Sequence, residues 1–288
     1  MIRYPGSKAK IVREILSCFP HTVLEPLFQG PRLEYREPFF GGGVIGFAVM
    51  ESLPARASVW INDKDFGMAA LWKVVHQRHD ELIDMVVKFQ PTTDAFYRFQ
   101  DEDNRTDMDP IRTAFQKFAL HQTSFSGLGA MAGGPIGGRK QSSKYNVDCR
   151  WNADRHCTDI IKHHRTLKRF GARVRITSGD FAPLVEDAMP HAFVYADPPY
   201  YEKGGQLYKC NMSDGDHRRL AAAFQTCRAP WVLSYDDHSF IRDLYQWAEV
   251  EDIQLTYTIA SSGKKRRKNS EVVIVPRGEV LASPAEVA

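Results

Sequence analysis

The sequence lacks the features that mark membrane, secreted and metal-binding proteins. No apolar run approaches the roughly 18 residues of a membrane span, and residues 1–10 lack the apolar stretch of a signal peptide. The five cysteines are an odd number, and no two of them have the CxxC spacing of zinc or redox sites. We therefore expect a cytoplasmic protein with reduced thiols, no membrane partner and no metal.

A strong excess of charge is also missing. The 38 Lys and Arg residues against 35 Asp and Glu residues give a net charge of +3, which by itself is too small to indicate a nucleic-acid partner. Basic residues nevertheless gather in three clusters, namely Arg139, Lys140, Lys144 and Arg150, then Lys162, Arg165, Lys168, Arg169, Arg173 and Arg175, and finally the run 264–268. One such cluster is as typical of a solvated face as of a binding site. Three of them together favour a polyanionic partner.

Short runs rich in β-branched and aromatic residues alternate with helical patterns along much of the chain. This alternation is typical of an α/β fold with a parallel sheet and crossover helices. The expected strands are residues 33–39, 58–62, 173–177, 192–196, 231–235, 253–259 and 271–275, of which the last two form an antiparallel finish. The expected crossover helices are residues 7–18, 44–51, 66–79, 214–227 and 239–247.

A long stretch between the second and third expected strands breaks the alternation. Helical patterns there flank a Gly-rich loop at 126–138, inside a segment, 123–150, that exceeds the roughly 15 residues of ordinary loops. Because 288 residues also exceed the usual length of one domain, we expect an inserted domain in this region.

The strongest local signal is the tetrad Asp197-Pro198-Pro199-Tyr200, which directly follows an apolar run. In an open parallel sheet, ligands bind outside the carboxyl ends of the strands, which is where the tetrad would lie. The two prolines stiffen the turn, so the carboxylate of Asp197 and the carbonyl of Pro198 can be held toward one point. Two such acceptors hold the N–H groups of an exocyclic amine and orient its nitrogen, while Tyr200 can stack on a flat base. A plain Pro-Pro turn that ends a strand is the alternative.

A glycine-rich stretch, Glu37-Pro38-Phe39-Phe40-Gly41-Gly42-Gly43, follows the first expected strand and precedes an apolar helix. Its glycines let the backbone approach a ligand, and the helix N-terminus supplies donors. Gly41, Gly43 and Gly46 also fit the G-x-G-x-x-G pattern, so a dinucleotide is a rival ligand. Asp63 ends the next strand, where it can accept from the ribose hydroxyls of S-adenosylmethionine or NAD equally, or form a plain Asx turn.

Two further elements carry candidate ligand residues. In Gly179-Asp180-Phe181, Asp180 can accept from an adenine amine and Phe181 can cover a ring, although a helix cap and a core phenylalanine fit as well. In Arg3-Tyr4-Pro5-Gly6-Ser7-Lys8, which precedes a helix, Lys8 can meet a carboxylate or lie on the surface.

With these elements in this order, the chain resembles the Dam-related, alpha-order group of adenine-specific DNA methyltransferases. The resemblance runs over nearly the whole chain, from Tyr4 through Lys8, Glu37 through Gly43, Asp63, Asp180 with Phe181 and the tetrad, to a basic loop before the final strand. It implies a Rossmann-like class I methyltransferase sheet with an inserted, mainly helical DNA-recognition domain. Residues 1–73 and 169–280 would form the catalytic domain, residues 74–168 the recognition domain and residues 281–288 a frayed tail.

The resemblance also implies the activity and the site residues. A bacterial or phage-encoded enzyme would transfer a methyl group from S-adenosylmethionine to the N6 amine of an adenine flipped out of double-stranded DNA, and a cognate restriction endonuclease would be a further partner. The cofactor-binding residues would be Tyr4, Lys8, Phe39, Gly41, Asp63, Asp180, Phe181 and Asp197. The catalytic residues would be Asp197 and Pro198, which bind the amine, Pro199, and Tyr200, which stacks on the flipped base.

DNA contacts are expected from the inserted domain. The segment 121–128 resembles the family's recognition segment, and it would contact DNA through Thr123 and Phe125. Phosphates would be bound by Arg139, Lys140 and Lys144. The segment departs from the family at His121-Gln122, where Asn-Arg is usual, and at Ser126, where Asn is usual; near the N-terminus, Ser7 stands where a second Gly is common. The departures leave the cofactor site in place and bear on the DNA sequence that is read.

Other activities stay open at this point. An NAD-dependent oxidoreductase could use the loop 41–46, but it would need a hydride-transfer acid, and no histidine in the sequence is a convincing candidate. The acceptor could also be RNA or the N4 amine of cytosine. A DNA-binding protein that has lost catalysis is a third alternative, against which the intact tetrad argues.

Overall fold

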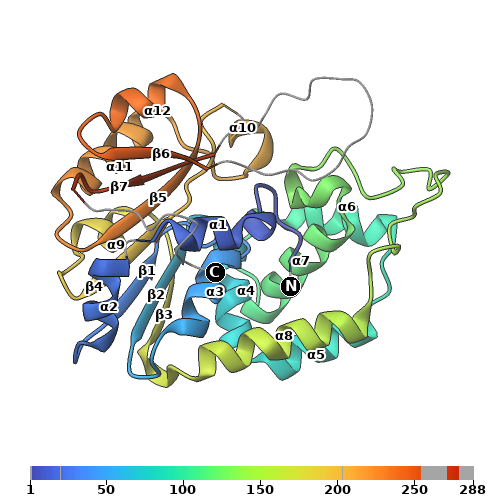
Figure 1. Ribbon diagram of the computed structural model, residues 1–288. Coiled ribbons are helices and arrows are strands. Elements are labelled where there is room, and N and C mark those ends of the chain that lie inside the picture. The colour runs from blue at the N-terminus through green and yellow to red at the C-terminus, as the bar shows by residue number, and fades with distance from the viewer. Residues whose placement is uncertain (1, 20, 203, 254–270, 279–288) are drawn as a thin grey trace.

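The computed structural model describes residues 2–19, 21–202, 204–253 and 271–278. Within these residues, seven strands form one sheet in the order β3-β2-β1-β4-β5-β7-β6 (Figure 1). The strands are β1 Glu34–Glu37, β2 Ser58–Asp63, β3 Val174–Ser178, β4 Ala192–Ala196, β5 Trp231–Asp236, β6 Glu249–Ile253 and β7 Glu271–Val275. The first five are parallel, whereas β7 runs antiparallel to its neighbours β5 and β6. This confirms the expected α/β class and its antiparallel finish.

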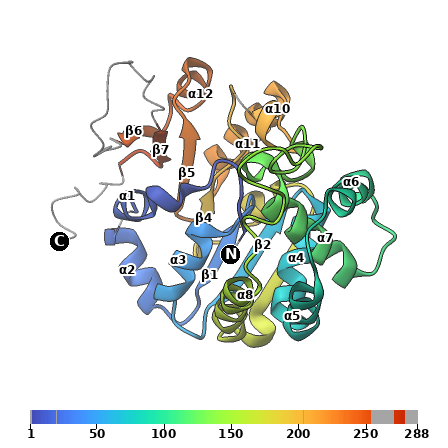
Figure 2. The ribbon, with the colours of Figure 1, turned by 90° about the vertical axis from the view of Figure 1, so that its right-hand side faces the viewer.

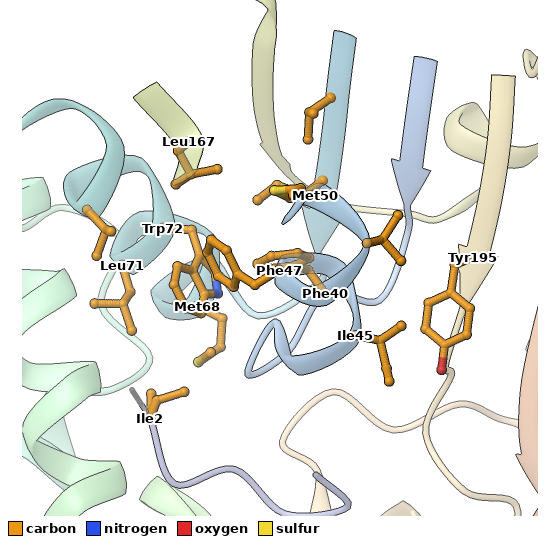
Figure 3. Close-up of a cluster of buried hydrophobic side chains, with 14 of the residues drawn as sticks. Ile2, Phe40, Ile45, Phe47, Met50, Met68, Leu71, Trp72, Leu167 and Tyr195 are labelled. Atoms are coloured by element: carbon orange, nitrogen blue, oxygen red, sulfur yellow. The ribbon is translucent and has the colours of Figure 1, made fainter. Parts of the chain in front are cut away.

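Helices cover both faces of the sheet because its central strands are apolar on both sides. In β4, Phe193 and Tyr195 face one core, while the alternate residues face the other. The first face is covered by η1 Lys8–Lys10, α1 Val12–Ser17, α2 His21–Gln29, α3 Val44–Ser52 and α4 Phe66–Gln77, and the second by α9 Ala182–Glu186, α11 Asp214–Thr226 and α12 Ser239–Leu244. In the first core, the ring centroids of Phe47 and Trp72 lie 5.0 Å apart (Figure 3).

A helical insertion lies between β2 and β3. After α4 it comprises α5 His79–Lys88, α6 Thr93–Glu102, α7 Pro110–Thr123, the short turns η2 Phe125–Gly127 and η3 Gly129–Met131, and α8 Ala153–Lys168, before η4 Gly171–Arg173 leads into β3. Helices α5 and α8 lie side by side (Figures 1 and 2), and α7 packs against α4. The first core extends from the sheet into these helices through Phe118 and Ile160. The expected boundary at residue 73 falls inside α4, and the division into two domains stays a prediction.

Polar side chains determine where several helices begin. Asp65 accepts from the N–H of Gly67 at the start of α4, and Asp109 accepts from the N–H of Ile111 at the start of α7. Ser213 forms a capping box at α11. The caps at Asp65 and Ser213 fix loops that follow β2 and β4, at the edge of the sheet where ligands are expected.

Most expected strands and helices are confirmed within a few residues. The expected helix 7–18 is divided at Ile11, which leaves the helical conformation, and α2, with Pro26 in its interior, is absent from the expected elements. Helix α12 ends at Leu244 rather than at residue 247. The expected strand 253–259 begins too late, since β6 begins at Glu249; residues 254–259 and the basic run 264–268 lie outside the described residues. In the part of the chain that the structure describes, no helix has both the length and the apolar character of a membrane span.

Candidate active site

A hollow lies where β1, β2 and β4 end, beside the N-terminal residues 4–8. The chain proceeds from β1 toward β3 on one side and from β4 toward β5 on the other, so this is the switch point at which α/β sheets bind ligands. The hollow encloses about 950 Å³, counting the solvent at its mouth. Its lining includes all the residues expected to bind the cofactor, namely Tyr4, Lys8, Phe39, Gly41, Asp63, Asp180, Phe181 and Asp197.

The glycine-rich loop between β1 and α3 forms the floor of the hollow. Gly41 has a φ of +47°, which favours glycine, and a Cβ atom there would lie 2.7 Å from Cε1 of Tyr4. The N–H of Gly41 donates to Oδ2 of Asp63 at 2.8 Å, and its carbonyl accepts from Nε1 of Trp72 at 2.9 Å. Both backbone groups of Gly41 are therefore held, and the absence of a side chain at this residue lets the ring of Tyr4 lie against the loop.

Asp63 is buried beneath this loop as the last residue of β2. Its Oδ1 accepts from the N–H of Asp65 at 2.8 Å. Burial and the charge of Asp65 raise the pKa of Asp63 to about 7, although its two backbone donors and Lys117 oppose the shift. Asp63 therefore changes its charge near neutral pH.

An aromatic wall is formed by Phe39 and Phe181, whose ring centroids lie 5.6 Å apart. Asp180 lies beside Phe181, where it accepts from the N–H of Ala182 at 2.9 Å and pairs with Arg219 at 3.0 Å. Burial alone would raise the pKa of Asp180, but these two partners hold it below its ordinary value. Phe181 is buried, whereas the Asp180 side chain is partly open to solvent at the rim of the hollow.

The tetrad leaves β4 at the same edge and meets Lys8. The buried ammonium of Lys8 lies 3.0 Å from Oδ1 of Asp197 and 3.1 Å from Oε2 of Glu271. It also donates to the hydroxyl of Tyr200 at 2.8 Å. Burial alone would lower the pKa of Lys8, but the two carboxylates outweigh burial and raise it. Oδ1 of Asp197 further accepts from the hydroxyl of Ser234 at 3.1 Å, so this carboxylate is held in a fixed orientation.

Asp236, at the end of β5, fixes the turn that follows the tetrad. Its carboxylate accepts from the N–H of Tyr201 at 2.9 Å and from that of Glu202 at 3.2 Å. Asp236, Ser234 and Glu271 are not among the site residues that the sequence predicts. The position of Asp236 at the carboxyl end of a strand is the signal that could have found it.

A buried chain of ion pairs connects the hollow to the insertion. Nζ of Lys117, on α7, lies 2.6 Å from Oδ2 of Asp65 and 3.0 Å from Oδ1 of Asp103. Asp103, just after α6, also pairs at 2.6 Å with Lys209, which lines the hollow after α10 Gly204–Leu207. Buried charges are tolerated when they are paired in this way. The loop after β2, the insertion and the segment after the tetrad are thereby fastened to one another.

Comparison with known proteins identifies the family. A sequence profile of the D12 class N6 adenine-specific DNA methyltransferases matches residues 4–259. The chain belongs to this family. The methyltransferase is 23% identical over 289 residues to the Type II methyltransferase M.MjaIII of Methanocaldococcus jannaschii, covering 92% of this chain and 94% of the relative. It is also 23% identical over 268 residues to the DNA adenine methylase of Escherichia coli K12, covering 87% of this chain and 88% of the relative.

Membership in the family decides the class of reaction. The methyltransferase modifies the N6 amine of adenine in DNA at specific sites, and its sheet is the expected Rossmann-like methyltransferase sheet. An oxidoreductase that uses the loop 41–46, and a methyltransferase for RNA or for cytosine N4, do not fit this family. Among the residues that the structure describes, His, Cys, Asp and Glu side chains form no group of three that could hold a metal.

The expected recognition segment of the methyltransferase, 121–128, lies beside the hollow, since the rings of His121 and Tyr4 are 5.4 Å apart. His121 is buried, and Nδ1 bonds to the carbonyl of Gly127 at 2.9 Å. Burial lowers the pKa of His121 to about 4, so the ring is neutral at physiological pH. Thr123 is buried too, and its hydroxyl donates to the carbonyl of Ala119 at 2.7 Å, so the side chain is not presented to DNA in this structure. Phe125, in contrast, is 64% exposed.

The three basic residues expected to bind phosphates lie in the long segment between η3 and α8, which extends at the right of Figure 1 in light green. Arg139, Lys140 and Lys144 are all exposed. The guanidinium of Arg139 lies 4.5 Å from the ring centroid of Tyr97, and the ammonium of Lys144 lies 5.7 Å from that of Tyr145. Their charges are available at the surface, and their role in DNA binding stays a prediction.

Proposed function

We propose that the methyltransferase takes its methyl group from S-adenosylmethionine, bound in the hollow, and adds it to an adenine flipped out of double-stranded DNA. The observation that carries this proposal is the placement of Asp197, which lines the same hollow as Asp63 and Gly41. When bound, S-adenosylmethionine supplies an electrophilic methyl group on a sulfonium.

The lining of the hollow fits this methyl donor. Gly41 brings no side chain into the hollow, and Asp63 ends β2, where carboxylates accept from ribose hydroxyls. Phe39 and Phe181 offer apolar cover for an adenine ring, and Asp180 can accept from its amine.

The tetrad would hold the target base. Asp197 and the carbonyl of Pro198 accept the two N–H groups of the adenine amine, which directs the nitrogen lone pair at the methyl carbon. Since Asp197 is already fixed by Lys8 and Ser234, this orientation is prepared before the base arrives. Flipping the base costs a few kcal/mol, of which stacking on Tyr200 returns about 1–3 kcal/mol.

Expression in a methylation-free host tests the proposal. Mapping modified adenines across the genome by single-molecule sequencing should reveal methylated adenines at a defined site. Purified enzyme should then transfer label from S-adenosylmethionine to a duplex that carries this site. A folded protein that leaves every adenine unmodified in both assays would contradict the proposed function.

Asp63 gives rise to a pH-dependent affinity for the methyl donor. With its pKa raised to about 7, this carboxyl is protonated below that pH and ionised above it. Ribose hydroxyls bond more strongly to the ionised form, by about 1.5 kcal/mol or roughly tenfold in Kd. We expect calorimetry to give a Kd for S-adenosylmethionine about fivefold higher at pH 6 than at pH 8. The Asp63→Asn variant should bind weakly at both values; the same pH dependence in both proteins would assign the effect to another group.

The insertion is the proposed DNA-recognition domain, because it presents exposed basic residues and Phe125, and because its segment 121–128 lies beside the hollow. Each phosphate that Arg139, Lys140 and Lys144 neutralise adds nearly one unit to the logarithmic salt dependence of binding. The triple alanine variant should therefore bind all duplexes more weakly, with a slope flatter by about one unit per lost contact. Fluorescence anisotropy of a labelled duplex between about 50 and 200 mM salt measures this slope.

The matched control replaces Arg32, Arg56 and Arg228 with alanine. These exposed residues precede β1, β2 and β5, at the amino ends of the strands and away from the hollow. This control should keep the slope of the wild type. If the Arg139, Lys140 and Lys144 variant also keeps that slope, these residues do not bind phosphates.

A cognate restriction endonuclease is a second proposed partner, since two of the relatives are named Type II methyltransferases. Extracts of the source organism should then cut unmethylated DNA at the mapped site and spare methylated DNA. Extracts that treat both DNAs alike would indicate a methyltransferase that acts without such a partner.

A further inference from the structure

Glu271 opens β7, the antiparallel strand beside β5, and lies opposite Asp236 in the sheet. It is 8% exposed, and its carboxylate reaches toward the N-terminal segment and the tetrad. Oε1 accepts from the hydroxyl of Tyr200 at 2.6 Å, and Oε2 lies 3.1 Å from Nζ of Lys8. A buried carboxylate thus contacts two of the side chains on which the target-base site depends.

The hydrogen bond to Glu271 fixes the ring of Tyr200. The hydroxyl of Tyr200 accepts from Lys8 at 2.8 Å and donates to Glu271, while the ammonium lies 4.5 Å from the centroid of the same ring. A hydroxyl held on both sides prevents the ring from turning about its side-chain bonds. A flipped base can stack on the ring of Tyr200 only if the ring keeps this plane.

The second contact divides one positive charge between two carboxylates. Lys8 lies at similar distances from Asp197 and Glu271, 3.0 Å and 3.1 Å, inside a buried cluster. If Glu271 lost its charge, the ammonium would be attracted more strongly to Asp197. It would then compete with the target amine for that carboxylate, because both are hydrogen-bond donors.

We propose that Glu271 is a positioning residue for methyl transfer. It holds the ring of Tyr200 in the plane that a flipped adenine requires, and it shares Lys8 so that Asp197 stays available to the target amine. This inference rests on the proposed roles of Tyr200 and Asp197.

The Glu271→Gln variant tests the proposal by comparing kcat with binding. We expect kcat to fall by about tenfold to a hundredfold, the size of effect that a misplaced reacting group produces. The Kd for S-adenosylmethionine should stay within about twofold of the wild type, and the Kd for DNA should rise by less than kcat falls, because only part of the stacking is lost. The control is Glu251→Gln, which removes an exposed carboxylate from the neighbouring strand β6 and should keep the wild-type kcat.

Fluorescence of 2-aminopurine at the mapped target position reports on Tyr200 directly. A ring held flat against the flipped base quenches its emission, so complexes of Glu271→Gln should emit more strongly than complexes of the wild type or of Glu251→Gln. The Tyr200→Phe variant removes the same hydrogen bond from the other side, and it should raise the emission even if Glu271→Gln fails to fold. The losses in kcat of the two variants should combine less than additively.

The outcomes separate this inference from the proposed function. A wild type that neither methylates adenine nor changes 2-aminopurine emission would contradict the proposed function itself. The wild type can instead methylate adenine and change 2-aminopurine emission while Glu271→Gln has the same kcat and emission as Glu251→Gln. In that case Glu271 has no positioning role. The same conclusion follows if the loss in kcat caused by Glu271→Gln adds fully to the loss caused by Tyr200→Phe. If Glu271→Gln does not fold, unchanged emission and kcat in Tyr200→Phe overturn the inference.

Discussion

Replacing Asp197 with alanine will abolish methylation while the protein keeps its fold. The carboxylate is fixed by Lys8 and Ser234 at the edge of the hollow, where it would accept one N–H of the target amine. Its loss leaves the amine unoriented and removes about 3 kcal/mol or more of transition-state stabilisation, which corresponds to at least about a hundredfold in rate. Initial rates of label transfer from S-adenosylmethionine to a duplex measure the effect.

Circular dichroism and the thermal midpoint decide whether the loss of activity is specific. Lys8 keeps an anionic partner in Glu271, so the Asp197→Ala variant leaves no uncompensated ammonium behind. The control Asp243→Ala removes an exposed carboxylate from α12 and should retain full activity. Near wild-type turnover by a folded Asp197→Ala variant would show that the amine is held elsewhere.

Replacing Lys117 with methionine will destabilise the protein strongly. The variant leaves buried Asp65 without its cation, while Asp103 keeps Lys209 as its partner. Breaking a buried ion pair on one side typically costs about 3–5 kcal/mol, and we expect the free energy of unfolding at pH 7 to fall by about that amount. Urea unfolding followed by circular dichroism measures it, with exposed Lys73→Met on α4 as the control.

The loss in free energy of unfolding caused by Lys117→Met should also depend on pH. Burial would raise the pKa of Asp65, but Lys117 is the main group that holds it below its ordinary value in the wild type. Without Lys117 the folded-state pKa rises above the unfolded value, so ionised Asp65 costs stability at neutral pH and the cost disappears as it is protonated. The difference in stability should therefore be smaller at pH 5 than at pH 8. A loss of stability that is equal at pH 5 and pH 8 would indicate that the variant loses packing instead.

The sequence predicts those parts of the site that are local in the chain. The tetrad, the glycine-rich loop and Asp63 each follow a strand directly, so the parallel-sheet rule alone brings them to one edge. The hollow is lined by the glycine-rich loop, by Asp63 and, within the tetrad, by Asp197 and Pro199, while their individual roles stay predictions.

Long-range strand pairing and local backbone contacts decide the parts of the site and of the fold that the sequence does not reveal. Glu271 reaches Tyr200 only because β7 inserts antiparallel beside β5, with Asp236 opposite Glu271, and no local pattern specifies that register. Thr123 is expected to contact DNA because the segment 121–128 resembles the family's recognition segment, yet its hydroxyl donates to the carbonyl of Ala119 within α7. Helix α2 is not predicted because Pro26, in its interior, interrupts the helical sequence pattern.

The pairing of β1 with β4 also orders events during synthesis. Glu34 pairs with Ala192, and the whole insertion must be translated between them. Ribosomes add about 5–20 residues per second, so on the order of ten seconds separate the emergence of β2 from that of β4. During this interval β1 lacks the neighbouring strand that β4 later provides. A chain arrested before residue 271 would hold the tetrad but not the strand that fixes Tyr200, so the tetrad is synthesised before the strand that positions it.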